Sequence, residues 1–360
     1  MIGDELKYES NTAVIVGASL SGLMSALALS RIGMKVIMLE RSAQKSRSGS
    51  ALPVSDGLIQ RLTGRHFAED ILPPGPQAWA DVYAGLHAVA SSDPNIDIHT
   101  SLRVKEIGQC EQSIWALTDN GETFSGCLLV GADGHASVVR RHIDPEHPDA
   151  TFAGYLIWLG VVEESELSSP PWPDGLAILD ARGYCLNAYY LPGADGSVAV
   201  GRRRLGFGWY DASQNDLLKA TGALIGEVVQ RTLRPVDIPE SIFQKLEKEA
   251  RSIWPDPWRE AILSCLGRRE IIGTPIGEYM PRRLVRGRIC MVGDAAHVPS
   301  PMTGRGFDES ARDALSLAEE VKKGKYNIAD ALQRYETNRL DTARELVRSG
   351  YRFSHSFTAK

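Results

Sequence analysis

Residues 12–40 read TAVIVGASLSGLMSALALSRIGMKVIMLE, and this stretch decides the fold of the chain. Thr12 to Val16 is a short apolar run with β-branched residues, which predicts a buried strand. Leu20 to Arg31 carries apolar residues at helical spacing, and Gly33 follows as a helix-ending glycine. Lys35 to Leu39 is a second apolar run. Strand, tight turn, helix and strand within about thirty residues predict a βαβ unit.

The turn between the first strand and the helix is Gly17-Ala18-Ser19-Leu20-Ser21-Gly22. Gly17 permits a tight exit from the strand, the small Ser19 lets a pyrophosphate approach backbone amides, and Gly22 lets the helix pack on the sheet. Glu40 ends the next strand, where an acid can bond ribose hydroxyls. Since Ser19 replaces a motif glycine, the turn alone also fits a plain strand–helix connection. The order of strand, helix, strand and acid predicts a dinucleotide site.

Two further turns indicate which dinucleotide is bound. Gly131-Ala132-Asp133-Gly134 ends one apolar run, and Gly293-Asp294-Ala295-Ala296-His297 ends another. A second strand-end carboxylate can bond a polyol, and a following helix N-terminus can face a polar ring edge. Each turn alone is a common β-turn, but the three in this order favour a flavin over nicotinamide.

The chain resembles the single-component FAD-dependent aromatic hydroxylases, the para-hydroxybenzoate hydroxylase superfamily. It carries the three signatures of that family in order, over about Ala13 to Leu346. Within the family, Ser19, the segment Val82 to Leu86 and the segment Arg202 to Tyr210 resemble most the dihydroxypyridine hydroxylases. The signature residues are Gly17 to Gly22 with Glu40-Arg41; Gly131 to Gly134 with Ser137, Val139 and Arg140; and Gly293 to His297 with Pro299, Pro301, Gly304 and Gly306.

The resemblance implies roles at FAD: the first turn at the pyrophosphate, Glu40 at the adenosine ribose, Asp294 at the ribityl chain and Pro301 along the flavin ring. Arg305 stands where the family usually has Gln, and Asp308 where it has Asn, so the pyrimidine contact departs from the pattern. The expected FAD-binding residues are Gly17, Ser19, Leu20, Ser21, Gly22, Glu40, Arg41, Val104, Asp133, Gly134, Asp294, Pro301, Gly304, Arg305, Gly306 and Phe307.

The resemblance also implies a reaction. In this family NAD(P)H reduces FAD, dioxygen adds at flavin C4a, and the hydroperoxide transfers one oxygen atom to an electron-rich carbon. The chain is therefore expected to be a monooxygenase that uses FAD, with NADH or NADPH as transient reductant and O2 as co-substrate. The expected substrate is a small aromatic or heteroaromatic ring, hydroxypyridine- or phenol-like. Two alternatives stay open: hydroxylation or epoxidation of a larger polycyclic natural product or antibiotic, and a flavin-binding protein without catalysis.

The pattern predicts an α/β fold, in which a Rossmann-like FAD-binding domain with a parallel sheet is interleaved with a substrate domain. Aromatic and β-type residues from Ala150 to Tyr210, with turn signals between them, predict an antiparallel sheet. We expect residues 1–75, 95–150 and 275–360 in the FAD-binding domain, with helices at the C-terminus. Residues 76–94 and 151–274 are expected to form the substrate domain, with a mixed or antiparallel sheet.

Candidate substrate residues lie on the expected antiparallel sheet. Tyr189 and Tyr190 are adjacent and must point to opposite faces. We expect Tyr190 to face the cavity, the alternative being a packed tyrosine. Arg202 and Arg204 share a face, opposite to Arg203. Arg202 is the candidate anchor for a polar ring substituent, with surface exposure as the alternative.

Composition limits the remaining classes. The 360 residues carry a net charge of −5, which favours neither nucleic acid nor an anionic membrane. No apolar run reaches the roughly 18 residues that a membrane span needs. Five dispersed cysteines without metal-ligand spacing predict a cytoplasmic protein with no metal site. The apolar stripe from Ile328 to Phe353 predicts packing on the FAD domain or a homodimer contact.

Overall fold

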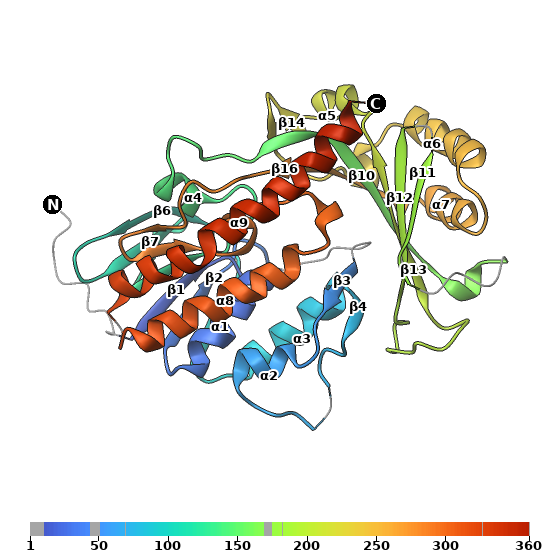
Figure 1. Cartoon of the computed structure of the whole chain (residues 1–360). Helices are drawn as coiled ribbons and strands as arrows, with labels where there is room; N and C mark the ends of the chain where they lie inside the picture. Colours follow the sequence, from blue (N-terminus) through green and yellow to red (C-terminus); the bar gives the residue numbers. More distant parts are fainter. Residues whose placement is uncertain are drawn as a thin grey trace.

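The computed structural model describes residues 11–43, 51–68, 70–168, 175–181, 183–325 and 327–359. Figure 1 shows a parallel-sheet part with helices α1 and α8, an antiparallel-sheet part with helices α6 and α7, and one long helix, α9, that extends from the first part to the second. The predicted α/β fold with a parallel and an antiparallel sheet is confirmed.

The parallel sheet begins with the βαβ unit that the sequence predicts. β1 (Thr12–Val16), α1 (Leu20–Arg31) and β2 (Lys35–Leu39) form it, and β1 is buried along its whole length. The strand order is β17-β18-β9-β1-β2-β5, and all neighbours are parallel except the pair β17–β18. The other strands are β5 (Ile96–His99), β9 (Leu128–Gly131), β17 (Val285–Arg286) and β18 (Ile289–Met291).

The register of this sheet brings three strand ends together. Val16 pairs with Gly131, and Gly131 pairs with Met291. The carboxyl ends of β1, β9 and β18 therefore lie at one edge. The three predicted Gly-containing turns follow these ends.

Smaller elements surround the parallel sheet, and one of them corrects the predicted domain division. We expect residues 76–94 in the substrate domain, but Trp79, Val82 and Leu86 of α3 belong to the core of the parallel-sheet part, because the apolar side of α3 packs on α1. The elements are β3 (Ala51–Val54), α2 (Leu58–Thr63), β4 (Gly75–Ala78), α3 (Trp79–Ser91), β6 (Val104–Gln109), β7 (Ile114–Thr118), β8 (Thr123–Gly126) and α4 (Val138–Ile143).

The antiparallel sheet has the order β11-β12-β13-β10-β15-β14, and β16 also pairs with β10. Its strands are β10 (Thr151–Glu163), β11 (Ala177–Ala181), β12 (Tyr184–Leu191), β13 (Arg204–Asp211), β14 (Leu224–Ile225), β15 (Val228–Val229) and β16 (Ile272–Glu278). The helical elements that accompany it are η1 (Glu164–Glu166), α5 (Asn215–Ala220), η2 (Pro235–Asp237), α6 (Glu240–Ile253) and α7 (Trp258–Gly267).

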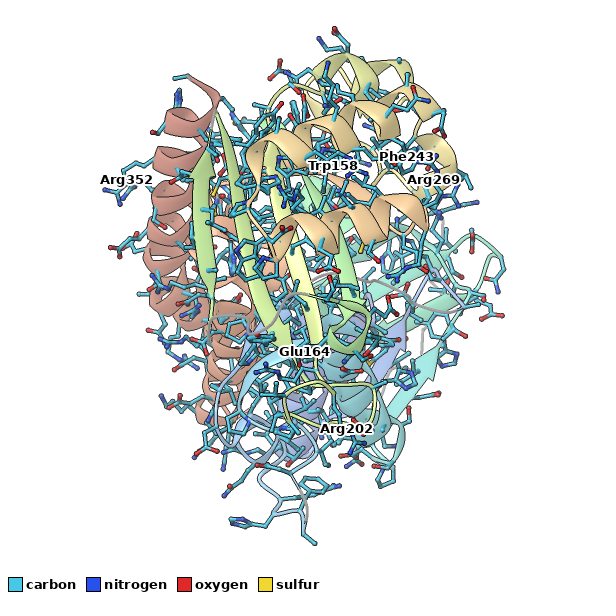
Figure 2. All side chains as sticks on the ribbon, turned by 90° about the vertical axis from the view of Figure 1, so that its right-hand side faces the viewer. Trp158, Glu164, Arg202, Phe243, Arg269 and Arg352 are labelled. Atoms are coloured by element: carbon cyan, nitrogen blue, oxygen red, sulfur yellow. The ribbon has the colours of Figure 1, made fainter. Side chains whose placement is uncertain are left out.

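The two faces of the antiparallel sheet differ. One, the helix-covered face, packs against α6 and α7, which cross in front of the strands in Figure 2, and Trp158 and Phe243 belong to the core that the two layers share. The other, the loop-side face, consists of the alternate residues and contacts α9 through Phe353 and Phe357. The helix-covered face includes Leu156, Trp158, Leu186, Ala188, Tyr190, Phe207 and Trp209. The loop-side face includes Tyr155, Ile157, Cys185, Asn187, Tyr189, Gly206, Gly208 and Tyr210.

The last part of the chain returns to the parallel sheet. η3 (Gly293–Ala295), η4 (Pro301–Thr303) and α8 (Gly306–Lys323) follow β18, and α9 (Ile328–Thr358) begins against the same core through Leu332 and Tyr335. None of the helices in the described ranges combines the length and the apolar character that a membrane crossing requires.

Candidate functional site

The first loop depends on two glycines. Gly17 has a φ of +101°, and a Cβ there would lie 2.4 Å from the Ala132 carbonyl oxygen. A Cβ at Gly22 would lie 2.0 Å from the Gly17 carbonyl oxygen. Since larger side chains would separate α1 from β1 and β9, glycine at both positions allows the close helix–sheet packing that the sequence predicts.

The N-terminus of α1 suits an anion. Ser19 is the N-cap residue, but its side chain makes no capping hydrogen bond, and the first turn holds no acidic residue. The first amides of a helix have no partner within the helix and carry partial positive charge. Ser19, Leu20 and Ser21 therefore leave these amides available to a pyrophosphate, which is the fit that FAD requires.

Glu40 lies next to the first loop and is 4% exposed. Its Oε2 accepts a hydrogen bond from Ala18 N at 2.9 Å, and its Oε1 accepts one from Ser42 N at 2.9 Å. A carboxylate can accept about four hydrogen bonds, a property that suits Glu40 to ribose hydroxyls. Leu102 N donates to the Glu40 carbonyl at 2.9 Å, so the segment that leads to the buried Val104 lies beside Glu40. Arg41 is exposed.

In the second loop, Gly131 to Gly134, the Asp133 carboxylate accepts hydrogen bonds from the residues that follow it. Asp133 Oδ2 accepts from Val138 N at 2.7 Å, and Oδ1 accepts from the Ser137 hydroxyl, so the carboxylate caps α4. Burial raises the pKa of Asp133, and the Ser137 hydrogen bond opposes that rise. Gly134 has a φ of +79°, which favours glycine there. The carboxylate of Asp133 therefore acts on its own loop.

Arg140 connects the second and third loops, a role that the sequence prediction did not assign. Its guanidinium is fully buried and donates to the carbonyl of Asp294 at 2.6 Å and of Ala295 at 3.0 Å. It also lies 4.1 Å above the ring of Tyr279. The sequence shows its place three residues after the Ser137 cap, but not the distant carbonyls that it reaches.

The third loop reaches α1. A Cβ at Gly293 would lie 2.6 Å from Ser21 Cβ and 3.1 Å from Ser310 Oγ of α8. The Asp294 side chain is exposed and makes no hydrogen bond within the described part of the chain, so it can bond a polyol. The N-termini of α1 and α8 therefore meet at this loop.

A buried ion network fixes the third loop from behind. His297 Nε2 lies 2.8 Å from Asp313 Oδ2, which also accepts from Gly293 N at 3.0 Å. Arg339 of α9 donates to Asp313 Oδ1 at 2.8 Å. Burial lowers the pKa of His297, but the Asp313 carboxylate outweighs it and raises that pKa overall. His297 therefore holds the third loop in place, and the Asp313 carboxylate compensates its charge.

The segment from Pro301 to Phe307 presents backbone to the same region. Gly304 has a φ of +61°, and the Arg305 guanidinium pairs with Glu309 Oε1 at 2.8 Å, along its own helix. No side chain caps the N-terminus of α8. Pro301, Gly304 and Arg305 are exposed, Gly306 is half-buried and Phe307 is buried. The uncapped amides at the start of α8, those of Gly306 and Phe307, fit the polar edge of a flavin ring.

The prediction for Tyr190 is wrong. Tyr190 belongs to the core of the helix-covered face, with the Arg203 guanidinium 3.6 Å from its ring centre. Tyr189 occupies the loop-side face, where its ring lies over Gly206, and it hydrogen-bonds the backbone of Ala51. Strand alternation requires that one tyrosine face each way, but it does not say which.

The prediction for Arg202 also needs correction. Arg202 is 66% exposed, pairs with Asp195 and lies in the loop beyond the strand ends in Figure 2. A local acid therefore holds it at the surface, away from the loop-side face. Arg204 does lie on that face, but Asp81 of α3 pairs with it at 2.7 Å.

The loop-side face offers other polar groups. Asn187 Nδ2 donates to the Tyr210 hydroxyl at 3.3 Å and lies 3.3 Å from Met302 Sδ of η4. Gly208 of β13 pairs with Asn187, so no side chain of β13 lies directly beside the Asn187 amide. Met302, next to Pro301, therefore packs against the part of this face that holds Asn187 and Tyr210.

Three loops at the carboxyl edge of a parallel sheet, opposite a partly polar face of a second sheet, define a flavoprotein of the hydroxylase fold. A family model described as "FAD binding domain" matches residues 10–113 and 266–350, and one described as "FAD binding domain-like" matches residues 152–265. The chain belongs to this FAD-binding family, the class A flavin hydroxylase superfamily. FAD as cofactor is confirmed.

Relatives match nearly the whole chain. The chain is 26% identical to 2,6-dihydroxypyridine 3-monooxygenase of Paenarthrobacter nicotinovorans, over 91% of this chain and 86% of that protein. It is 23% identical to 3-hydroxybenzoate 6-hydroxylase of Klebsiella oxytoca, over 93% and 86%. The solved structure of 2,6-dihydroxypyridine-3-hydroxylase from Arthrobacter nicotinovorans matches with a TM-score of 0.79 at 22% identity, over 98% of this chain and 94% of that one.

Proposed function

We propose that the chain is a FAD-dependent monooxygenase that uses NADH or NADPH and O2 to hydroxylate a small electron-rich aromatic or heteroaromatic ring. One observation carries the proposal: three FAD-fitting loops converge opposite a face that presents Asn187, Tyr189 and Tyr210. Bound FAD supplies the activation of dioxygen, which protein side chains cannot perform alone. The relatives, named as FAD-dependent or aromatic hydroxylases, support the same activity.

The described residues support a small, dry site. Tyr155 and Tyr210 lie side by side with ring centres 5.8 Å apart, and Phe353 and Phe357 of α9 contact them edge-on. This cluster closes the loop-side face at the end where α9 crosses. A closed apolar wall limits water near the flavin, which protects the oxygen-transfer step.

The charges of the loop-side face favour a ring with hydroxyl groups over one with a carboxylate. Arg204 is the cation of this face within the described ranges, and Asp81 already pairs with it. A buried substrate carboxylate without a cation would be costly. Asn187 and the tyrosine hydroxyls can instead donate to and accept from neutral ring substituents. This supports a hydroxypyridine- or phenol-like substrate.

The test is an oxygen-electrode and NAD(P)H-oxidation screen of the FAD-loaded protein with hydroxypyridines, phenols, hydroxybenzoates and polycyclic phenols, using both NADH and NADPH. We expect substrate-stimulated oxidation and a ring product that carries one atom from ¹⁸O2, identified by mass spectrometry. Products from polycyclic compounds alone would favour the natural-product alternative. Flavin binding with no product from any compound would contradict a monooxygenase function.

A further inference from the structure

A chain of buried hydroxyl groups connects Glu278 to the segment that contains Pro301. Ser354 Oγ donates to Glu278 Oε1 at 2.9 Å, and the Tyr155 hydroxyl lies 3.4 Å from Ser354 Oγ and 2.8 Å from Ser300 Oγ. Each of these four side chains is at most 5% exposed. Ser300 is the N-cap of η4, and its Oγ accepts from Met302 N at 3.3 Å. This chain of hydrogen-bonded side chains therefore ends, at Ser300, where the flavin is expected.

The packing of α9 holds both ends of this chain. A Cβ at Gly350 would lie 2.8 Å from Ser300 N and 3.3 Å from Glu278 Oε1, so the helix backbone rests directly on both. Phe353 and Phe357 cover the Tyr155 ring edge-on. Water therefore has little room to replace any member of the chain.

Counting protons gives the chain a direction. An ionised Glu278 can only accept, so Ser354 donates to it; since each hydroxyl has one proton, Tyr155 must then donate to Ser354, and Ser300 to Tyr155. When Glu278 takes a proton from solvent, its new O–H bond can donate to Ser354, and every donor in the chain reverses. The O–H bond of Ser300 then no longer points to Tyr155 and can point to the segment that contains Pro301.

We propose that Glu278 is a positioning residue for the FAD site, which it controls by reversing the donors along Ser354, Tyr155 and Ser300. The proposal rests on the proposed contact of FAD with Pro301. Its consequence is that one buried carboxyl, held between β16 and α9, alters the hydrogen bond that Ser300 offers to the flavin-contacting segment.

The surroundings of Glu278 place this change near neutral pH. Burial raises the pKa of Glu278 to about 7, and the Ser354 hydrogen bond opposes the rise. The titratable groups facing Glu278 within the described residues are Tyr155 on β10 and Tyr351 on α9. No lysine or arginine of the described ranges forms an ion pair with Glu278.

The test is the absorbance and fluorescence of bound flavin in the FAD-loaded protein, titrated from about pH 5.5 to about pH 8.5 without reductant or substrate. We expect a one-proton transition near pH 7 in the wild type, and its loss in Glu278→Gln. Ser354→Ala and Tyr155→Phe should also abolish it, because they break the chain while Glu278 still ionises.

Tyr351→Phe is the matched control, since Tyr351 faces Glu278 without joining the chain, and it should keep the transition. A transition that persists in Glu278→Gln, or a wild type that shows none, overturns the proposal. Should Glu278→Gln fail to fold, Ser354→Ala decides. The measurement needs bound FAD but no turnover, so failure to hydroxylate any ring would leave its outcome readable.

Discussion

The two faces of the antiparallel sheet are built from alternate residues of the same strands, yet they differ in chemistry. The helix-covered face is aromatic and aliphatic, and α6 and α7 bury it. The loop-side face combines hydroxyl groups, the Asn187 amide and two strand glycines, Gly206 and Gly208. One face therefore contributes stability and the other is available for chemistry. Substitutions on the two faces should separate these effects.

The largest expected effect is on the helix-covered face. Trp209 is fully buried and packs edge-on against Tyr184 and Trp254. Trp209→Ala should lower the free energy of unfolding by about 3–5 kcal/mol, because it leaves a large cavity. Denaturant titration measures this loss. Turnover per FAD-loaded molecule should stay near the wild-type value, and a turnover loss larger than the loss of folded protein would contradict the division between the faces.

The next effect is the pH dependence of stability from Glu278. The pKa is raised to about 7 from an ordinary 4.5, so the folded state binds the proton more tightly. That stability is fully present below about pH 4.5 and is lost as pH rises through about 7. Glu278→Gln should therefore raise the free energy of unfolding at pH 8 by about 2–3 kcal/mol. The exposed Glu270→Gln is the control, and an equal gain there would refute the assignment.

A smaller effect is expected for Asn187, on the loop-side face. Asn187→Leu keeps the side-chain volume but removes the donor and acceptor, so kcat/KM should fall about 10–100-fold, or about 1.4–2.7 kcal/mol. The free energy of unfolding should change by only about 1 kcal/mol. Leu186→Met, one residue earlier on the other face, should leave kcat/KM unchanged. Equal kinetic losses in the two variants would remove the distinction.

The smallest effect compares two neighbouring hydroxyl groups. Tyr189→Phe removes a hydroxyl from the loop-side face and should lower kcat/KM by a factor of about ten or less, near 1 kcal/mol. Tyr190→Phe removes one from the helix-covered face and should leave kcat/KM unchanged. Steady-state kinetics of the two variants and the wild type, purified in the same way, measure this difference. The reverse order would mean that the strand presents its other face to substrate.

The FAD side could be predicted because it is local in sequence. Gly17, Gly22 and Glu40 lie within one βαβ unit, where strand exit, helix packing and strand end follow from neighbouring residues. The fold class followed from the same periodicities. The connection made by Arg140 was missed because its partners, the carbonyls of Asp294 and Ala295, lie 154 and 155 positions further along the sequence.

The substrate side depended on tertiary contacts. Nothing in the alternation of Tyr189 and Tyr190 says which face α6 and α7 cover, and Arg202 is held by Asp195 at the surface. Strand glycines do not tell the faces apart either, since Gly206 and Gly208 lie on the loop-side face and Gly160 lies against Cys265 of α7 on the helix-covered face.

The central claim is that three loops hold one FAD, and calorimetric titration of FAD into the flavin-free protein tests it most directly. We predict one FAD per chain, and a Kd at least about ten times higher for Glu40→Ala, since that change removes the acceptors facing the ribose. A folded chain that binds no FAD, or binds it equally well after Glu40→Ala and Gly22→Val, would contradict the claim.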